Sequence, residues 1–237
     1  MNKVKNIFAS SVLLIATFVV LSVSAYASDF SNRLEMAKKQ ASAEMLTQYK
    51  TNEEKAKVSK LIDDFFDYSN KTIYEIERLK REQEKIDVSL VWEQKNFYDK
   101  VVLDKTLIEH KKFIDNLEAT NKIYFKAKED LMIKIKNSVL NAEHKKEFLE
   151  GLSEGFGEKG SLIIKRQDLY KDLVKINTQV ISIIKRNFGK LSQQNGVYYF
   201  TNEIDLEEYN RLIPAYTIKR KEIDNVTKLL FEAERKN

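Results

Sequence analysis

The distribution of helix-breaking residues most constrains the fold of this chain. Its first 150 residues contain neither glycine nor proline, and all 237 residues include six glycines and one proline. Glycine and proline destabilise helices most, so their absence permits long uninterrupted helices. The same scarcity excludes a loop-rich β-sandwich, a disordered linker and a collagen-like chain. We therefore expect an all-α protein.

An amphipathic stripe predicts a helix over residues 52–86. Thr51 and Glu54 have the spacing of a capping box, in which hydroxyl and carboxylate satisfy reciprocal backbone N–H groups. A helix of this length spans about 50 Å at about 1.5 Å per residue. We expect a shorter helix before it, over about 30–49. The apolar stripe consists of Val58, Leu61, Ile62, Phe65, Phe66, Ile73, Ile76 and Leu79.

A second stripe advances by steps of four and three residues, the pattern of coiled coils and helical bundles. Polar His110, Asn121 and Lys128 interrupt this seam, where polar side chains fix register or face the end of a bundle. The helix is expected to begin as early as Val88, with Asp87 as its cap. The seam consists of Leu103, Leu107, His110, Ile114, Leu117, Asn121, Tyr124, Lys128, Leu131 and Ile135.

The rest of the chain predicts two helices and a small β-ribbon. Asn141 is expected to cap a short helix that ends at Gly151, and a further stripe predicts a helix over about 162–189. The Asn-Gly pair at 195–196, followed by four residues that favour strands, predicts a β-ribbon near 191–200.

A last helix completes the predicted fold. Asp205 with Glu208 is expected to cap it, and Pro214 is expected to kink it. The whole pattern predicts an elongated, mostly antiparallel bundle of about five helices that forms a single domain over 28–237.

Residues 1–27 have the pattern of an export signal. Lys3 and Lys5 precede an apolar stretch from Ile7 to Val23, and the small residues of Ala25-Tyr26-Ala27 fit a signal peptidase site. We expect cleavage after Ala27 and a periplasmic or secreted protein without a stable membrane span. The alternative is an N-terminal membrane anchor, because the apolar stretch approaches the length of a span.

Charge and cysteine content exclude several classes of protein. Cleavage would remove two of 41 basic residues and none of the 36 acidic ones, so the net charge would fall from +5 to +3. This near balance predicts no nucleic-acid partner, because nucleic-acid binding needs a clustered basic face. The absence of cysteine excludes disulfides, thiolate zinc sites and a cysteine nucleophile.

Four of the six glycines fall within ten residues. The stretch 155–160 reads G-F-G-E-K-G and matches the letters of the dinucleotide-binding pattern. That pattern needs a strand before it and a βαβ unit around it, and neither is predicted here. We interpret the stretch as a turn between helices and a candidate hinge. The hinge residues are Gly151, Gly155, Gly157 and Gly160.

No catalytic, cofactor-binding or metal-binding residue is predicted. His110 and His144 are the two histidines, and neither has a glutamate three residues before it, as E-x-x-H carboxylate sites require. The stretch E-H-K-K occurs at 109–112 and again at 143–146, but the rest of a helical repeat signature is absent. Aromatic side chains are the better candidates for an interaction surface. These candidates are Trp92, Tyr198, Tyr199 and Phe200.

Two segments near the C-terminus carry a resemblance. They read N-G-V-Y-Y-F-T over 195–201 and E-Y-N-R-L-I over 208–213. Both resemble the end of a bacterial family of helical envelope lipoproteins, a domain-of-unknown-function family. The resemblance implies a helical fold and an envelope location. The lipidated cysteine of that family is absent here, where Ala27 and Ser28 stand at the junction.

These observations favour a non-enzymatic helical scaffold or protein-binding module of the cell envelope. Long charged helices with wide apolar stripes suit docking to a partner helix, either of an envelope protein or of a second copy. The alternative is a chaperone-like or peptide- or lipid-binding bundle with a groove between helices. An enzyme with a dispersed site and a secreted helical toxin remain further alternatives.

Overall fold

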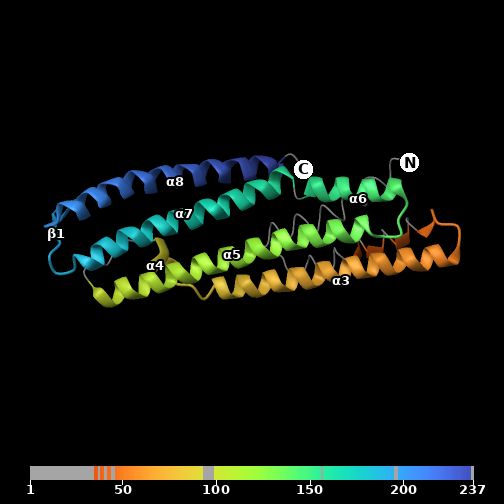
Figure 1. The fold of residues 1–237 in the computed structure, drawn as a ribbon, viewed down its shortest axis with the longest axis horizontal. Helices are drawn as coiled ribbons and strands as arrows, with labels where there is room; N and C mark the ends of the chain where they lie inside the picture. The colour runs from red at the N-terminus through yellow and green to blue at the C-terminus, as the bar shows by residue number, and fades with distance from the viewer. Residues whose placement is uncertain are drawn as a thin grey trace. The chain divides into compact units, whose positions relative to one another are not determined.

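The structure is a computed structural model that describes residues 35–36, 38–39, 42–43, 46–92, 99–155, 157–194 and 197–235. The predicted export signal lies outside these residues, and so does the predicted Asn-Gly turn. Nearly all described residues are helical, which confirms the all-α prediction (Figure 1). The elements are α3 (Asn52–Gln83), α4 (Val88–Trp92), α5 (Lys100–Lys136), α6 (Ala142–Gly155), α7 (Glu158–Arg186), β1 (Ser192–Gln194), β2 (Val197–Tyr199) and α8 (Glu203–Arg235).

Two helices start at the caps that the sequence predicts. The backbone N–H of Glu54 donates to Thr51 Oγ1 at 3.1 Å, and the Thr51 N–H donates back to Glu54 Oε2 at 3.1 Å. At the start of α6, Asn141 Oδ1 accepts from the backbone N–H of His144 at 2.8 Å. Local sequence therefore sets where α3 and α6 begin.

The long helix predicted from Val88 is wrong at its start. Asp87 caps only the short α4, where its Oδ1 accepts from the backbone N–H of Ser89 at 3.1 Å. The long helix α5 begins at Lys100, because Asp99 Oδ1 accepts from the backbone N–H of Val101 at 2.8 Å. A second capping residue close behind the first thus begins a new helix.

The cap predicted for the last helix is also wrong. Asn202 Oδ1 accepts from the backbone N–H of Ile204 at 3.0 Å, so α8 begins at Glu203. Asp205 and Glu208 bind Arg186 instead of the backbone of their own helix. The helix continues through Pro214.

The described residues pack as two compact units. Unit 1 contains α3 up to Arg81, α5 from Ala119 onward, α6, and α7 up to Ile163. Unit 2 contains the remaining parts of α5 and α7 together with α4, the β-ribbon and α8. The single domain over 28–237 stays a prediction.

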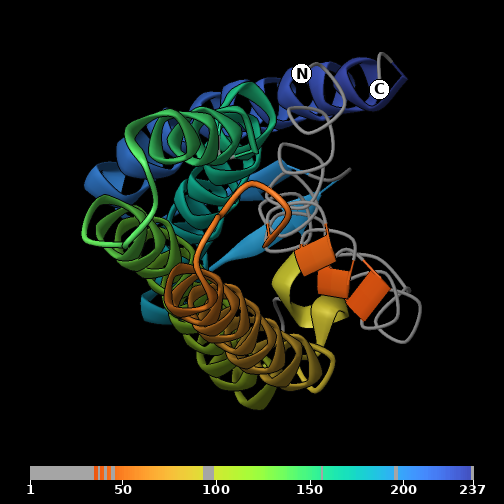
Figure 2. The same cartoon turned by 90° about the vertical axis from the view of Figure 1, so that its right-hand side faces the viewer.

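In unit 1, α3 and the second half of α5 lie side by side and antiparallel, as Figures 1 and 2 show. Their facing stripes and the apolar face of α6 form its core, as the alternating steps of four and three residues predict. The buried apolar residues of these helices include Val58, Ile62, Phe65, Phe66, Ile73, Ile76, Leu79, Tyr124, Ala127, Leu131, Ile135, Phe148 and Leu152.

In unit 2, α7 and α8 are joined by an antiparallel β-ribbon, which confirms the predicted ribbon. Ser192 pairs with Tyr199 and Gln194 pairs with Val197. The α7–α8 pair buries its core against the first half of α5 and against α4. The buried residues of this core include Val91, Leu103, Phe113, Leu117, Val174, Val180, Ile181, Ile183, Ile184 and Leu212.

Candidate functional site

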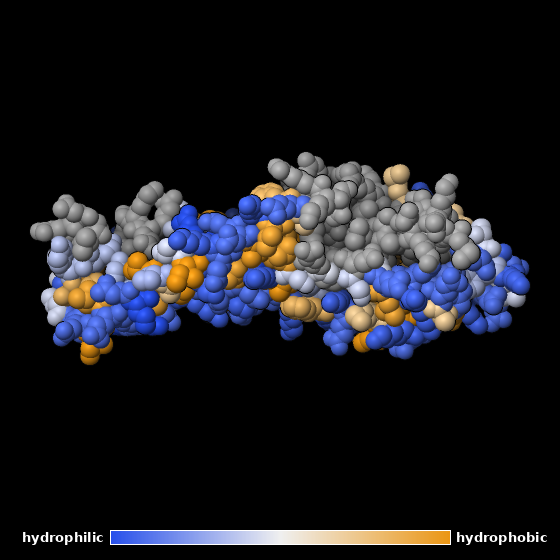
Figure 3. Space-filling model, turned by 90° about the horizontal axis from the view of Figure 1, so that it is seen from above, coloured by the Kyte–Doolittle hydropathy of each residue, from blue (hydrophilic) through white to orange (hydrophobic). Residues whose placement is uncertain are grey.

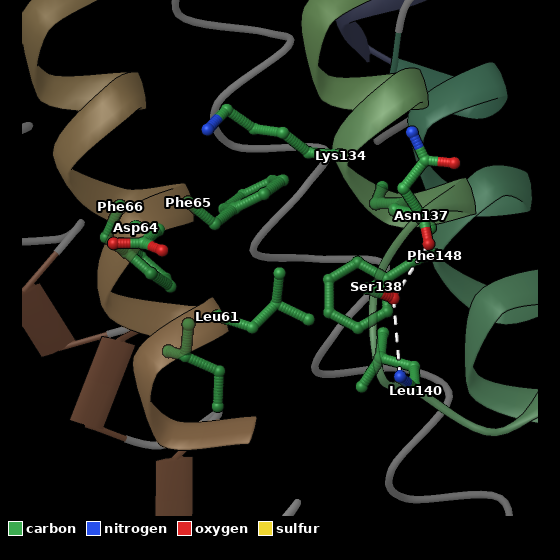
Figure 4. A pocket seen from close by; sticks show the side chains of 11 residues that line it. Leu61, Asp64, Phe65, Phe66, Lys134, Asn137, Ser138, Leu140 and Phe148 are labelled. Carbon is green, nitrogen blue, oxygen red and sulfur yellow. Dashed lines mark hydrogen bonds between the residues drawn. The ribbon is translucent and has the colours of Figure 1, made fainter. Parts of the chain in front are cut away.

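An apolar pocket of about 170 Å³ lies in unit 1, between α3, the C-terminal end of α5 and α6. Figure 4 shows Leu61 and Phe65 of α3 pointing toward Phe148 of α6 and Leu140 of the α5–α6 loop. The lining is completed by Ile62, Asp64, Phe66, Lys134, Ile135, Asn137 and Ser138.

The lining changes from apolar and buried to polar and exposed. Phe66, Phe148 and Ile135 are at most 5% exposed. By contrast, Asp64 and Lys134 are exposed. A buried apolar wall with a few polar groups at its edge is typical of small-molecule sites.

The sequence builds this pocket through helical spacing and two local contacts. Residues 61, 62, 65 and 66 share one face of α3, because three- and four-residue steps repeat with the helical turn. Ser138 Oγ donates to the carbonyl oxygen of Ile135 at 2.7 Å and fixes the loop that carries Leu140. The Asn141 cap begins α6 and so places Phe148 two turns further along the helix.

Three aromatic rings meet at the wall of the pocket. The ring centroids of Phe65 and Phe148 lie 6.1 Å apart at an interplanar angle of 68°. Phe65 and Phe66 lie 5.9 Å apart at 67°. Both pairs have the edge-to-face geometry that aromatic quadrupoles favour.

The charged edge of the pocket is connected to a tyrosine. Lys134 Nζ lies 5.5 Å from the ring centroid of Tyr68, within the range of a cation–π contact. The Tyr68 hydroxyl donates to Asp130 Oδ2 at 2.7 Å. Burial, and then this hydrogen bond, raise the pKa of the Tyr68 phenol. The phenol therefore stays protonated at neutral pH.

His144 lies in a second polar contact of unit 1. Its Nδ1 is 2.8 Å from the hydroxyl of Tyr49, and its Nε2 is 2.6 Å from Oε1 of Gln48. Both ring nitrogens are thus engaged, and the ring is buried. The histidine ties the residues before α3 to α6, which is a structural role.

His110 occupies a buried polar cluster in unit 2. Its Nδ1 lies 2.8 Å from Thr178 Oγ1, and its Nε2 lies 3.4 Å from Nδ2 of Asn177. The Thr178 hydroxyl donates its hydrogen to the carbonyl oxygen of Val174 at 2.8 Å, so it can accept from His110 Nδ1–H. Asn177 Nδ2 also donates to the carbonyl oxygen of Val91 at 3.0 Å and so holds α4 against α7.

Burial lowers the pKa of His110 from 6.5 to about 4, and the Val91 and Leu90 carbonyls oppose this effect only in part. The ring is therefore neutral at pH 7. Within the described ranges, no three His, Asp or Glu side chains gather closely enough to hold a metal ion. The hydrogen bonds of this cluster join α5 to α7 and α7 to α4.

A charged cluster joins the end of α7 to the start of α8. Arg186 Nε donates to Asp205 Oδ1 at 2.7 Å, and an Arg186 Nη donates to Glu208 Oε2 at 2.6 Å. Asn187 Nδ2 donates to Asp205 Oδ2 at 2.8 Å. The Arg186 guanidinium, followed by the Asn187 amide, lowers the pKa of the Asp205 carboxyl. Asp205 and Glu208, which the sequence predicts as a helix cap, contact the end of α7 instead.

The candidate hinge glycines occupy different positions in the structure. Gly151 is buried inside α6, so this helix runs past its predicted end to Gly155. Gly157 forms a bend, and Gly160 is buried in the first turn of α7. The connection between α6 and α7 thus falls among three of the predicted residues. The hinge itself stays a prediction.

The candidate interaction aromatics separate into two groups. Trp92 packs edge-on against Phe113 at a centroid distance of 5.3 Å and lies 5.7 Å from Tyr170. Trp92 is the last residue of α4 and packs, partly buried, against the cluster that contains Phe113. Trp92 therefore contributes to the core of unit 2.

The ribbon aromatics gather around a tyrosine of α8. Tyr198 and Phe200 lie 5.9 and 5.2 Å from the ring of Tyr209. Tyr199, on the opposite face of the strand, is 50% exposed. Of the four candidates, the structure brings Tyr198 and Phe200 together and leaves Tyr199 accessible.

Sequence reasoning found Leu61, Phe65 and Phe66 only as a helical stripe and missed the pocket. No local signal indicates that Lys134, Leu140 and Phe148 converge on that stripe.

Among the described residues, no helix combines the length and the apolarity needed to cross a membrane. Comparison of the chain with protein-family models, with curated proteins and with solved structures gives no match.

Proposed function

We propose that this chain is an exported, non-enzymatic helical scaffold or protein-binding module of the cell envelope. The observation that supports this proposal is a set of three exposed apolar side chains on one side of α8, spaced about 21 and 16 Å apart along the helix axis. Ile204, Ile218 and Leu229 are 73%, 57% and 48% exposed. At about 100° per residue, the three positions fall within about 40° of one another around the helix axis. We call them the α8 stripe.

The exposure of these three aliphatic side chains favours recognition by apolar contact. Large exposed aliphatic side chains on one helix face are typical of helices that dock a partner helix. Figure 3 shows one face of the molecule, on which hydrophilic side chains surround separate hydrophobic patches. Because basic and acidic residues nearly balance, net charge would contribute little to the choice of partner. The expected partner is an envelope protein or a second copy of this chain.

Site-specific photo-crosslinking in cells tests this proposal. A photoreactive amino acid replaces Ile218 in one variant and Arg220 in the other. Arg220 is exposed and lies about 160° from Ile218 around α8, so it serves as the matched control. We expect one dominant crosslinked protein from position 218 and little from position 220.

The identity of the crosslinked protein separates the forms of the proposal. A single envelope protein supports a binding module, and a crosslink to the same chain supports a homo-oligomeric scaffold. Equal capture from both positions, or none from position 218, would contradict a role of the α8 stripe.

The pocket of unit 1 favours a second candidate function, a bundle that binds a small apolar ligand. Its volume and buried aromatic wall suit one ring or a short chain rather than a whole lipid. This function is independent of the α8 stripe, which belongs to unit 2.

A further inference from the structure

We infer that the unit 1 pocket binds a small molecule whose apolar part is one aromatic ring. The inference rests on the second candidate function and names its class of ligand. It is carried by the size of the pocket and the geometry of its aromatic wall.

The size of the pocket limits the apolar part of the ligand to about one ring. Apolar cavities of about 150 Å³ lined by Leu, Ile and Phe accept benzene. The pocket here measures about 170 Å³, and seven of its eleven lining residues are Leu, Ile or Phe. Fused rings and long acyl chains would exceed this volume.

The wall of the pocket favours an aromatic ring over an aliphatic one of equal size. The Phe65 ring meets the rings of Phe66 and Phe148 at interplanar angles of 67° and 68°. An additional ring can continue this edge-to-face arrangement, which contributes beyond the burial of apolar area. The expected preference over a saturated ring is about threefold to tenfold in affinity.

A pair of matched alcohols tests the inference. The purified full-length chain, labelled with ¹³C at Leu and Ile methyl groups, is titrated with benzyl alcohol and separately with cyclohexylmethanol. We expect saturable NMR shifts of Leu61, Ile62, Ile135 and Leu140 with benzyl alcohol, at a Kd on the order of 1 mM. Cyclohexylmethanol should bind about threefold to tenfold more weakly.

A variant that fills the pocket provides the control. Leu61 is half-buried, so Leu61→Phe should fold while its ring occupies the ligand volume. Leu149→Phe changes an equally half-buried leucine of α6 that does not line the pocket. We expect Leu61→Phe to weaken benzyl alcohol binding at least tenfold and Leu149→Phe to leave it unchanged.

Three outcomes would overturn the inference. Equal affinity for both alcohols would exclude the aromatic preference but retain apolar ligand binding. The absence of saturable shifts with either alcohol would exclude both the inference and the second candidate function. Equal loss of binding in the two leucine variants would place the ligand outside the pocket. The wild-type titrations decide the question even if Leu61→Phe fails to fold.

Discussion

His110 shows how burial fixes the protonation of a single residue. Its ring is 1% exposed, and its neighbours are a hydroxyl and an amide rather than a carboxylate. The backbone carbonyls of Val91 and Leu90 compensate a positive charge only in part, so folding favours the neutral ring. The hydrogen bonds of this cluster connect α4, α5 and α7, so protonation of the ring would affect the contacts among all three helices.

This environment makes the stability of the protein depend on pH. The folded pKa of about 4 lies below the ordinary 6.5, so between these values the unfolded chain binds a proton that the folded chain does not. The free energy of unfolding should therefore fall as pH drops from 6.5 to 4, by roughly 3 kcal/mol in total. Urea unfolding at several pH values measures this loss.

His110→Gln supplies the comparison for that experiment. The variant should lose stability at pH 7, because glutamine cannot reproduce the contacts of the ring. It should also lose the part of the pH dependence that arises between 6.5 and 4. An imidazole NMR titration that places the midpoint of His110 near 6.5 would refute the buried, neutral ring.

Gly189 is a residue whose backbone conformation limits substitution. Its φ is 78°, in the left-handed region that follows the end of α7. A Cβ atom built at this position meets no neighbouring atom within 4 Å, so only the backbone conformation disfavours a side chain. Gly189→Ala should destabilise the protein by about 1 kcal/mol, and Gly189→Asn by less. Thermal unfolding of both variants measures the difference, and equal stability of Gly189→Ala and wild type would contradict it.

At the scale of elements, the Arg186 cluster holds the start of α8 to the end of α7. Asp205 is 5% exposed and accepts from both Arg186 and Asn187, whereas Glu208 accepts from Arg186 nearer the solvent. Asp205→Asn should cost about 2 kcal/mol, because a buried charged partner is lost. Glu208→Gln is the matched control and should cost less than about 1 kcal/mol. Chemical denaturation of both variants measures these values.

The same cluster predicts a loss of stability in acid. The folded pKa of Asp205 is lowered, so its contribution is present above the ordinary carboxyl pKa and is lost as pH falls through the folded value. Asp205→Asn should therefore reduce the acid sensitivity of the protein. A variant as acid-sensitive as wild type would show that Asp205 does not stabilise the α7–α8 contact.

Two helix starts were predictable from a local contact. Thr51 with Glu54 and Asn141 with His144 bind within four residues, and the sequence predicted both helix starts. The predicted start of α8 was wrong because Asp205, which has the sequence pattern of a cap, binds Arg186, 19 residues earlier in the chain. The predicted start of α5 was wrong because Asp87 and Asp99 can each cap a helix, and the periodicity of apolar residues does not distinguish between them.

At the scale of the whole molecule, the stripes predicted which faces are buried but not which side chains meet. Leu117 and Leu131 are buried as the seam predicts. The pocket needs Leu61, Lys134 and Phe148, which are distributed over 88 positions of the chain. A periodic pattern carries no information on such pairings, because each helix could pack its stripe against any other. This is why sequence reasoning yielded candidate aromatics but no pocket.

The proposed envelope role depends on export of the chain, which stays a prediction. Signal peptidase needs small residues at positions −3 and −1, which Ala25 and Ala27 supply. We expect the protein recovered from cells to begin at Ser28. Ala27→Arg should leave the full chain uncleaved because the −1 side chain becomes too large. Ser28→Ala keeps both small residues and should be processed normally. N-terminal sequencing and intact mass measure the outcome, and a wild-type chain that still begins at Met1 in the membrane fraction would instead support the N-terminal anchor.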